Sequence, residues 1–393
     1  MPEGRKAGTW HPGEYRPFLV GFLKVHNELL KGNLARVLEN LSEVCDIIAV
    51  CDDGSYDGSA ELLASHPKIP ADLLLTYDSP SFNQELERKE TLLERVLAYR
   101  PQWIFWLDGD EALDAHGLAG LRSYLRRLPP HIQSVDMAEA NLWLSERWAR
   151  TDSLWGKGNF CRCWRGQAGL HFLASEGLHR PQFPVELLGA PSATAPFSVL
   201  HFGFSSRSHQ RFKILQYATT CPEALPRLPY AAEGEFELID SSDFPWPVSK
   251  DAPRPPPAVG EEYIAAVMGI GLVEDGLGIV NGTSKLCVVT ISTYNQGASL
   301  PGAIDSVLAQ TCPKWILLVV DDASDDDTAA VVAGYMEEDP RIFYLRYPEK
   351  RGRRATSQVS RDVAARWAPR RLTLRSNGHL APTRVAREVR RCG

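Results

Sequence analysis

A run of five apolar residues, Trp103–Leu107, leads directly into the turn Asp108-Gly109-Asp110. Such a run is typical of a strand buried on both faces of a sheet. In open sheets built from alternating strands and helices, ligands bind just beyond the carboxyl ends of the strands. Two carboxylates placed there suit a hard divalent cation, and a simple capped turn is the alternative. A phosphatase with an aspartyl nucleophile would carry a Thr soon after the pair, where this chain has Glu111.

The chain before this turn alternates between apolar runs and helical patterns. We expect strands at 18–25, 46–50, 73–76 and 103–107, and helices at about 28–43, from about 58 onward, and at about 83–99. Strands and helices that alternate at these lengths predict a doubly wound, mostly parallel α/β sheet. Residues 18–240 form the first predicted domain, with halves at 18–128 and 129–240, after a loose lead-in at 1–17. A further helix is expected at 212–219.

The early pattern recurs late in the chain. A Pro-rich linker is predicted at 241–284, and a strand, a helix and a second strand follow it within 286–320. The Asp321-Asp322 pair then repeats Asp52-Asp53. The spacing from Asn27 to Asp53 is 26 residues, and from Asn295 to Asp322 it is 27. Matching order and spacing predict a second, partial α/β unit of the same type at 285–366.

The second unit lacks the acidic turn. Asp108 follows Asp53 by 55 residues, and the same step from Asp322 reaches Asn377, in Arg375-Ser376-Asn377. No apolar strand is expected after Trp367, and residues 351–393 carry 12 Arg against two acidic residues, a net charge of +10. A phosphate-binding adaptation would explain this basic tail, 367–393. A truncated or frame-shifted end is the simpler explanation.

Composition bounds the class of protein. The 393 residues are 44% hydrophobic and 23% charged, as in ordinary globular proteins. No apolar stretch reaches 18 residues, and the polar start lacks the apolar segment of a signal peptide. Eight scattered cysteines do not suggest a disulfide framework, and Cys161 and Cys163 have no second pair at zinc-site spacing. We therefore expect a cytoplasmic protein that has no transmembrane segment and does not bind nucleic acid.

Polar residues follow the first two predicted strands. Asn27-Glu28 and Asp52-Asp53 lie where a base and a ribose can be held, and carboxylates accept hydrogen bonds from ribose hydroxyls. The alternative is that Asp-Gly-Ser only forms a turn and caps a helix. Arg88 and Lys89 precede the acidic strand, where a guanidinium and an ammonium can contact a diphosphate. A solvated charged face is the alternative for these two.

These motifs together resemble the front half of a family 2 glycosyltransferase. The resemblance rests on Val25-His26-Asn27-Glu28, on the segment 51–59 and on Leu107-Asp108-Gly109-Asp110-Glu111, and it covers about residues 17–220. It implies a GT-A-like fold, a nucleotide-sugar donor and a divalent metal, Mg²⁺ or Mn²⁺. It places the residues that bind the nucleotide-sugar at His26, Asn27, Glu28, Asp52, Asp53, Arg88, Lys89 and Asp108.

The resemblance also suggests the remaining site residues. Asp108 and Asp110 would bind the metal, and His201, in a His-aromatic-Gly-aromatic segment, would complete its ligands; a core histidine is the alternative. Inverting transfer needs a base for the acceptor proton. Glu176 is the first candidate and His179 the second, with a solvated Glu as the alternative. On the helix expected at 212–219, Lys213 and its neighbours Arg211 and Tyr217 are candidates to close over the phosphates.

The predicted function is metal-dependent transfer of a sugar from a nucleotide-diphosphate-sugar to an acceptor hydroxyl, with inversion. The resemblance suggests a role in cell-envelope or surface polysaccharide or glycoconjugate synthesis. The acceptor would be a glycan, a lipid-linked molecule or a protein, and peripheral membrane association is compatible with this role. A non-catalytic protein that binds nucleotide-sugars or acts as a scaffold is the alternative. Nucleotidyl transfer would need a Gly-rich basic loop after the first strand, which His26-Asn27-Glu28 does not provide.

Overall fold

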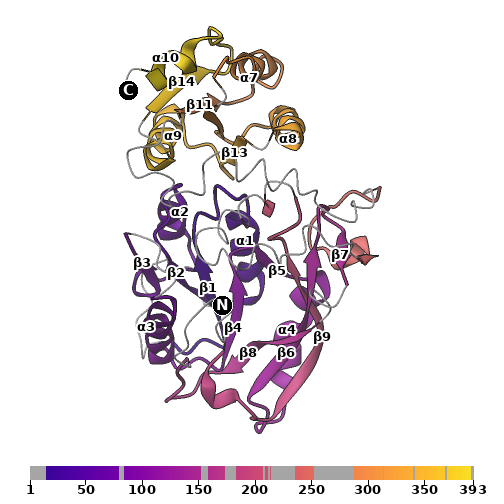
Figure 1. The fold of residues 1–393 in the computed structure, drawn as a ribbon. Coiled ribbons are helices and arrows are strands. Elements are labelled where there is room, and N and C mark those ends of the chain that lie inside the picture. The colour runs from indigo at the N-terminus through magenta and orange to yellow at the C-terminus, as the bar shows by residue number, and fades with distance from the viewer. Residues whose placement is uncertain are drawn as a thin grey trace. The chain divides into compact units, whose positions relative to one another are not determined.

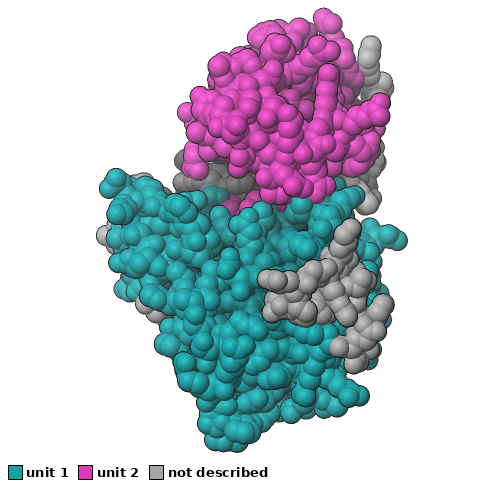
Figure 2. Space-filling view, turned by 180° about the vertical axis from the view of Figure 1, so that it is seen from behind, with its two compact units in different colours: residues 1–28, 33–206, 234–255 teal, residues 29–32, 207–233, 256–393 magenta. Residues whose placement is uncertain are grey.

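The computed structural model describes residues 15–78, 84–151, 158–172, 183–206, 209–210, 213, 235–251, 287–312, 314–339, 341–367 and 370–390. The chain forms two compact units, which Figure 2 shows in separate colours. Unit 1 comprises residues 1–28, 33–206 and 234–255, and unit 2 comprises residues 29–32, 207–233 and 256–393.

Unit 1 is an α/β unit built on one large sheet. Its strands are β1 Leu19–Val25, β2 Ile47–Asp52, β3 Leu74–Thr76, β4 Trp103–Asp108, β5 Glu111–Leu113, β6 Ser134–Leu142, β7 Trp148–Arg150, β8 Asn159–Arg165, β9 Ser192–His201 and β10 Phe236–Leu238. Its helices are α1 Leu34–Val44, α2 Ser59–Ser65, α3 Glu85–Ala98 and α4 Ala115–Arg127.

The order of strands places the candidate motifs side by side. The main path is β10-β7-β6-β8-β4-β1-β2-β3, while β9 pairs with β5 and β6. The segment β4-β1-β2-β3 is parallel, so the carboxyl ends of β4, β1 and β2 share one edge of the sheet (Figure 1). The remaining strands pair mostly antiparallel. The predicted α/β class with parallel central strands is confirmed.

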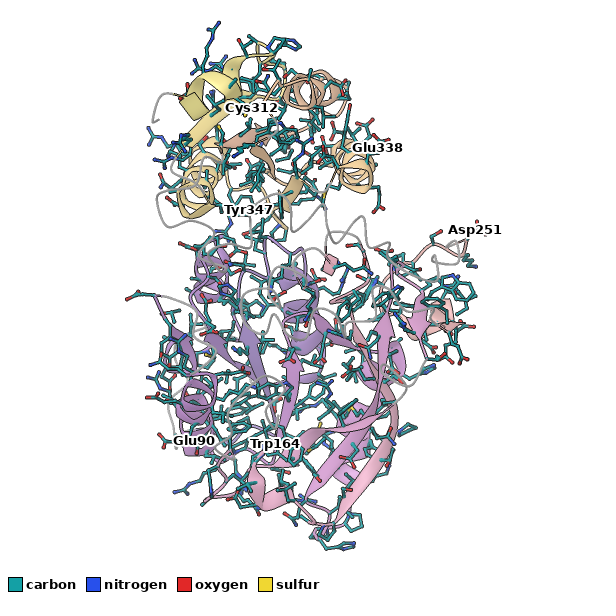
Figure 3. All side chains as sticks on the ribbon, viewed as in Figure 1. Glu90, Trp164, Asp251, Cys312, Glu338 and Tyr347 are labelled. Carbon is teal, nitrogen blue, oxygen red and sulfur yellow. The ribbon has the colours of Figure 1, made fainter. Side chains whose placement is uncertain are left out.

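Aromatic packing fixes the strands that carry the motifs. Phe22 of β1 stacks on Trp106 of β4, with 5.1 Å between ring centroids. Trp164 of β8, labelled in Figure 3, packs against both rings and is fully buried. Burying such large side chains contributes roughly 1.5–3 kcal/mol each. The ends of β1 and β4 are therefore held in a fixed relation.

A side chain on α1 closes the free edge of β5. The Asn40 Nδ2 group donates to the backbone oxygen of Leu113 at 2.9 Å, and the Leu113 N–H donates to Asn40 Oδ1, also at 2.9 Å. Asn40 is buried. Its amide thus occupies the place that a neighbouring strand's peptide group would take.

Unit 2 is a smaller parallel α/β unit. Its sheet has the order β13-β12-β11-β14, and all three strand pairs are parallel. Its elements are β11 Cys287–Thr293, α7 Leu300–Leu308, β12 Trp315–Asp321, α8 Thr328–Glu338, β13 Ile342–Arg346, α9 Arg353–Trp367, β14 Arg370–Arg375 and α10 Arg384–Arg390.

The strand β14 corrects one expectation. We expected no strand after Trp367, but Arg370–Arg375 pairs in parallel with β11 over six residues. Leu372 and Leu374 are buried while the residues between them are exposed. An edge strand with one face on the core needs only this alternation, not a continuous apolar run. Val385 of α10 is also fully buried, so the basic segment contributes to the core of unit 2.

The Pro-rich segment begins inside unit 1. Phe244 is buried and Trp246 is partly buried, and both pack with Phe202 in one apolar cluster. The beginning of the predicted linker 241–284 therefore belongs to the packing of unit 1, and residues 252–284 lie outside the described residues, as does most of 212–219. In the described part of the chain, no helix has the length and apolar character needed to cross a bilayer.

Candidate functional site

A left-handed asparagine organises the first turn at the edge of the unit 1 sheet. Asn27, after β1, has φ = 55°, a conformation that asparagine tolerates better than most residues. Its N–H donates to Ser55 Oγ at 2.9 Å, and its Oδ1 accepts the N–H of Tyr56 at 3.0 Å. Asp52 accepts the N–H of Ser55 through Oδ1 at 3.0 Å. The ends of β1 and β2 are therefore joined by side-chain hydrogen bonds.

Unit 2 repeats this network. Asn295 has φ = 50°, its N–H donates to Ser324 Oγ at 2.9 Å, and its Oδ1 accepts the N–H of Asp325 at 3.0 Å. Asp321 accepts the N–H of Ser324 at 3.0 Å. The bonds match those of Asn27 one for one, in type and in length. The recurrence seen in the sequence thus corresponds to one turn built twice.

His26 is part of the same turn in unit 1. Its Nδ1 lies 2.9 Å from the backbone oxygen of Asp53, which can only accept, so Nδ1 carries the ring proton. Its Nε2 lies 2.9 Å from Asn27 Nδ2 and accepts from it. His26 is therefore a neutral residue that braces the turn.

Burial of Asp52 raises the pKa of its carboxyl group to about 6, although Ser55 donates to it. The residue is 1% exposed, so it cannot reach a ligand in bulk solvent without a change in the turn. The turn-forming alternative accounts for Asp52. Its neighbour Asp53 is also buried, and contact of Asp53 with a ligand stays a prediction.

Basic groups surround Asp53. Arg88 donates a short hydrogen bond to it, and Lys24 Nζ lies 3.4 Å from its carboxylate. Lys89 pairs with Glu85 at 2.6 Å, and Lys24 lies 3.6 Å from the same residue. Arg88 and Lys89 are buried, so the solvated-face alternative is wrong for both. Contact of either side chain with a diphosphate stays a prediction.

The acidic turn needs its glycine. A Cβ added at Gly109 would lie 2.5 Å from Cγ of Glu28 and 3.2 Å from the backbone oxygen of Lys24. Glu28 is itself held, since its Oε2 accepts from Asn33 at 3.0 Å. Close packing between the turns after β1 and β4 therefore explains why the two aspartates flank a residue without a side chain. Glu28 contacts this turn from the β1 side.

A buried ion cluster supports the acidic turn from behind. The N–H of Asp108 donates to Glu111 Oε2 at 2.8 Å. Arg162 of β8 forms two hydrogen bonds of 2.7 Å with Glu111 and a shorter one with Glu139 of β6. The side chains of Arg162 and Glu111 are both buried. Burial raises the pKa of Glu111 to about 7, although the positive charge of Arg162 lowers it. Sequence reasoning gave Arg162 and Glu139 no role at this turn, because the pairing of β6 with β8 that brings them together is antiparallel and has a register shift.

Asp110 and His201 lie next to each other at the end of the acidic turn. His201 Nε2 lies 3.4 Å from Asp110 Oδ2, and both side chains are 12% exposed. His201 Nδ1 lies 2.6 Å from Asn141 Oδ1 and donates to it, since an amide oxygen only accepts, and this contact turns Nε2 toward the Asp110 carboxylate. With a neutral ring, the Nε2 lone pair and the carboxylate would suit a shared cation.

The donor set fits a metal that is only partly held by protein. In the described residues, no group of three His, Cys, Asp or Glu side chains converges to hold a metal by itself. Mg²⁺ is commonly bound through one or two carboxylates, with phosphate oxygens and water as the other ligands. Asp110 and His201, with Asp108 two residues away, match that pattern and not an all-protein cage.

Several predicted residues cannot be placed in the site. The base candidates Glu176 and His179 lie outside the described residues, as do Arg211 and Tyr217. Cys163 is fully buried, and burial raises the pKa of the Cys161 thiol to about 12. A protonated, buried thiol is a poor metal ligand. The two cysteines therefore belong to the packing of β8.

A model of one protein family matches the chain at residues 288–358, and the family is glycosyl transferase family 2. This segment of unit 2 is therefore similar to family 2 glycosyltransferases. The matched residues begin in β11, include the turn at Asn295 and Asp321, and end within α9, before β14. The family 2 match therefore falls on the turn that both units share.

Curated relatives have low identity. The chain is 25% identical over 212 residues to an uncharacterized protein of Mycobacterium bovis and to one of Mycobacterium tuberculosis, covering 52% of this chain and 51% of each relative. The chain thus spans about half the length of the curated relatives it matches.

Solved structures give only partial superpositions. S. aureus TarS superimposes with a TM-score of 0.34 at 9% identity, over 52% of this chain and 40% of TarS. The mannosyltransferase PcManGT from Pyrobaculum calidifontis, in complex with GDP-Man and Mn²⁺, gives a TM-score of 0.22 at 24% identity, over 25% of this chain and 29% of that protein.

The two units differ at the strand that lies beside the first strand of each sheet. This third strand is β4, beside β1, in unit 1 and β14, beside β11, in unit 2. In unit 1, Lys24 of β1 is in register with Asp108 of β4. In unit 2, Ser292 of β11 is in register with Arg375 of β14. By this register, Arg375-Ser376-Asn377 takes the place of Asp108-Gly109-Asp110. The turn that both units share is therefore followed by an acidic strand end in one unit and a basic strand end in the other.

Proposed function

We propose that unit 1 transfers a sugar from a nucleotide-diphosphate-sugar to an acceptor hydroxyl, with inversion and with the help of a divalent metal. One observation carries this proposal. Three polar turns, at Asn27, Asp53 and Asp108, lie at the carboxyl ends of adjacent parallel strands, where such sheets bind ligands. The same turn in unit 2 lies within the segment that matches family 2, which supports this class of donor.

The residues divide into two groups by chemistry. Asp53 and the Asn27 turn would hold the nucleoside, because a carboxylate and an amide accept and donate to ribose hydroxyls and base edges. Arg88 and Lys89 would contact the diphosphate after release from Asp53 and Glu85. Ligand binding would thus replace ion pairs that are already present in this structure.

Asp108, Asp110 and His201 would hold a Mg²⁺ or Mn²⁺ ion, which when bound supplies positive charge beside the departing diphosphate. Asn141 orients the His201 ring, and Glu111 holds the backbone of Asp108. These contacts fix the ligands before the donor arrives, so little ordering is needed on binding.

Transfer exchanges one bond for another at the anomeric carbon. The acceptor oxygen forms a bond to that carbon while the bond to the diphosphate oxygen breaks, and the hydroxyl proton passes to a general base. Glu176, with His179 as second candidate, stays a prediction for this base. The role in surface glycan synthesis also stays a prediction from the resemblance.

The test compares Asp110→Asn with the unchanged chain. Transfer from a panel of nucleotide-sugars to mixed acceptors is measured with Mg²⁺, Mn²⁺ or EDTA. We expect activity that needs metal and a loss of about 100-fold or more in the variant. Asp251→Asn, on the exposed surface, is the matched control.

Full metal-dependent turnover by Asp110→Asn would show that the acidic turn is not the metal site. Binding of a nucleotide diphosphate without transfer in any acceptor mixture would support the non-catalytic alternative instead.

A further inference from the structure

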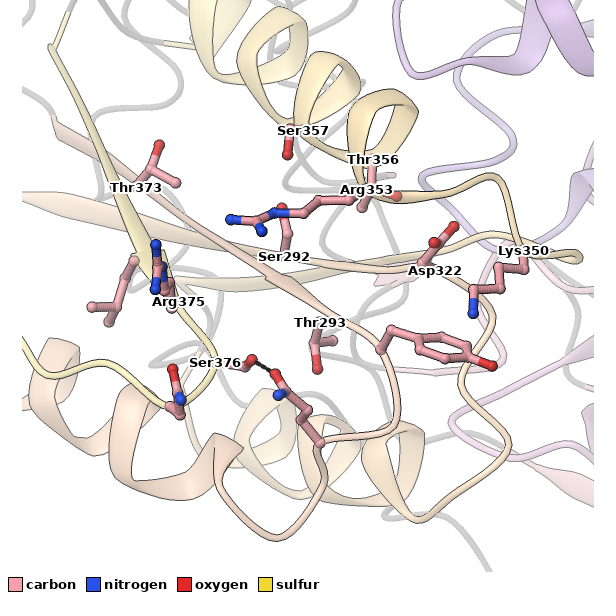
Figure 4. Close-up of a pocket in the computed structure, with 14 residues that line it drawn as sticks. Ser292, Thr293, Asp322, Lys350, Arg353, Thr356, Ser357, Thr373, Arg375 and Ser376 are labelled. Carbon is pink, nitrogen blue, oxygen red and sulfur yellow. Dashed lines mark hydrogen bonds between the residues drawn. The ribbon is translucent and has the colours of Figure 1, made fainter.

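Unit 2 has a cavity of its own at the carboxyl ends of β11, β12 and β14. Its volume is about 450 Å³, which lies in the range of small-ligand sites. Figure 4 shows side chains from all three strands and from the start of α9 around it. Every residue that lines the cavity belongs to unit 2.

The cavity is lined by cations. Arg375 comes from the end of β14, Arg353 from the start of α9, and Lys350 from the loop before it. No carboxylate in the described residues forms an ion pair with any of these three groups. The Lys350 ammonium lies 3.7 Å from the centre of the Tyr294 ring. The positive charge is thus available to a ligand.

The acidic residue in the cavity wall is already engaged. Asp322, at the position of Asp53 in the shared turn, accepts the N–H of Arg351 at 2.7 Å and that of Gly352 at 2.9 Å. Backbone donors partly offset its charge. Asp322 therefore does not neutralise the arginines across the cavity.

A second observation points to a ligand. Thr293 lines the cavity, is 4% exposed, and its Oγ1 has no hydrogen-bond partner. Buried hydroxyls normally find a partner, because leaving one unpaired costs free energy. A ligand oxygen in the cavity would supply it. Figure 4 shows Thr293 between Asp322 and Ser376, at the centre of the lining residues.

We propose that this cavity binds a diphosphate group, carried by a nucleoside or free as pyrophosphate, without a divalent cation. Two guanidiniums and an ammonium provide the charge that a metal provides elsewhere, and guanidiniums pair with phosphate oxygens through two parallel hydrogen bonds. Thr293 donates its hydroxyl to the same ligand. The inference stands on unit 2 alone and does not depend on sugar transfer by unit 1.

Calorimetric titration of the full chain in EDTA tests this proposal. The probes are pyrophosphate, UDP and GDP. We expect binding that persists in EDTA, is weakened about 10- to 100-fold in Arg375→Ala, and is weakened less in Thr293→Val. Arg371→Ala, on the same strand but outside the cavity, is the matched control and should bind as the unchanged chain does.

The probes separate the two sources of the ligand. Equal binding of pyrophosphate and nucleotides would assign recognition to the diphosphate alone, whereas tighter binding of UDP or GDP would add the nucleoside. Absence of binding in EDTA, or equal affinity of Arg375→Ala and Arg371→Ala, would overturn the proposal. So would binding in EDTA that disappears in Arg88→Ala of unit 1. If Arg375→Ala does not fold, Thr293→Val, which keeps the side-chain shape, decides the question.

The outcome can be separated from that of the proposed function. Transfer is measured with metal and binding with EDTA. A chain that transfers no sugar but shows EDTA-resistant binding dependent on Arg375 would refute only the proposed function. A chain that transfers sugar without such binding would refute only the inference about unit 2.

Discussion

The two units build the same turn and then differ at the next strand. Asn27 and Asn295 have the same left-handed backbone and the same two hydrogen bonds. Beyond them, β4 ends in Asp108 and β14 ends in Arg375, at equivalent register. The turn therefore positions the strand ends, while the sign of the charge at the third strand decides which ligand chemistry each edge offers.

The support behind the third strand also differs. In unit 1, Glu111 and Arg162 fix the backbone of Asp108 through a buried ion cluster. In unit 2, Gly378 takes the position of Glu111, and Ser376 donates to Gln296 instead (Figure 4). The strand end at Asp108 is thus held by a buried ion pair, whereas the strand end at Arg375 is held by a hydrogen bond between two neutral side chains.

The largest effect is expected from Arg162→Met, which tests whether the ionic support is needed. The change leaves Glu111, which is buried, and Glu139, which is partly buried, without their cation, which costs about 3–5 kcal/mol. Urea unfolding, followed by hydrogen exchange of peptides from unit 1, measures the loss. Arg127→Met on the exposed side of α4 is the control, and adding Glu111→Gln to Arg162→Met should recover part of the stability.

Two substitutions at the end of β14 would reverse the charge of the unit 2 cavity. Arg375→Asp with Asn377→Asp gives unit 2 the acidic pattern of unit 1. We expect diphosphate binding in EDTA to fall about 100-fold, because an attractive charge becomes a repulsive one. Titration with and without Mg²⁺ is the measurement. Unchanged binding in EDTA would contradict the claim that the charge at the end of β14 controls diphosphate binding.

The pH dependence of unit 1 tests the burial of Asp52. Its pKa of about 6 lies above the ordinary value of 3.8, so its contribution to stability is fully present below about pH 4 and is lost as the pH rises through 6. Relative to the unchanged chain, Asp52→Asn should therefore gain about 2–3 kcal/mol between pH 4 and pH 7.5. Unfolding at the two pH values, with Glu39→Gln as the exposed control, measures it. A constant difference would contradict the assignment.

The smallest effects are expected at the shared turn. Asn27→Ala and Asn295→Ala each place alanine in a left-handed conformation, at a cost of about 1–2 kcal/mol. The first also removes the side-chain hydrogen bonds with Tyr56 and His26, and the second removes the one with Asp325. Asn→Gly at either position should cost less, because glycine accepts the backbone conformation. Hydrogen exchange in peptides around each turn gives the two values. Clearly unequal losses would show that the turns are alike in geometry but not in energy.

The sequence predicted the parallel core because its strands are long apolar runs. The strands at 18–25, 46–50 and 103–107 lie in the middle of the sheet, where both faces are buried. Strand β14 was missed for the opposite reason. It lies at an edge, and Leu372 and Leu374 alternate with Arg371, Thr373 and Arg375, so only one face follows the hydrophobic pattern.

The candidate site was predictable to the extent that it lies on consecutive parallel strands. Asp110 was assigned to a metal together with His201, and the two lie 3.4 Å apart. The partners Arg162, Glu139 and Asn141 could not be assigned, because β6 pairs antiparallel with β8 and parallel with β9, with a register shift in each pairing. Burial of Arg88 and Lys89 was also missed, since local patterns do not show which charges find a buried partner.

The contact between Asn40 and Leu113 has a consequence for aggregation. A strand whose N–H and C=O groups are free on one side can recruit the same strand from another molecule. Here a single amide on α1 occupies that side of β5. Asn40 thus fills the hydrogen-bonding positions of Leu113 that another strand would use, and Asn40→Leu would leave the buried N–H and C=O of Leu113 without these partners.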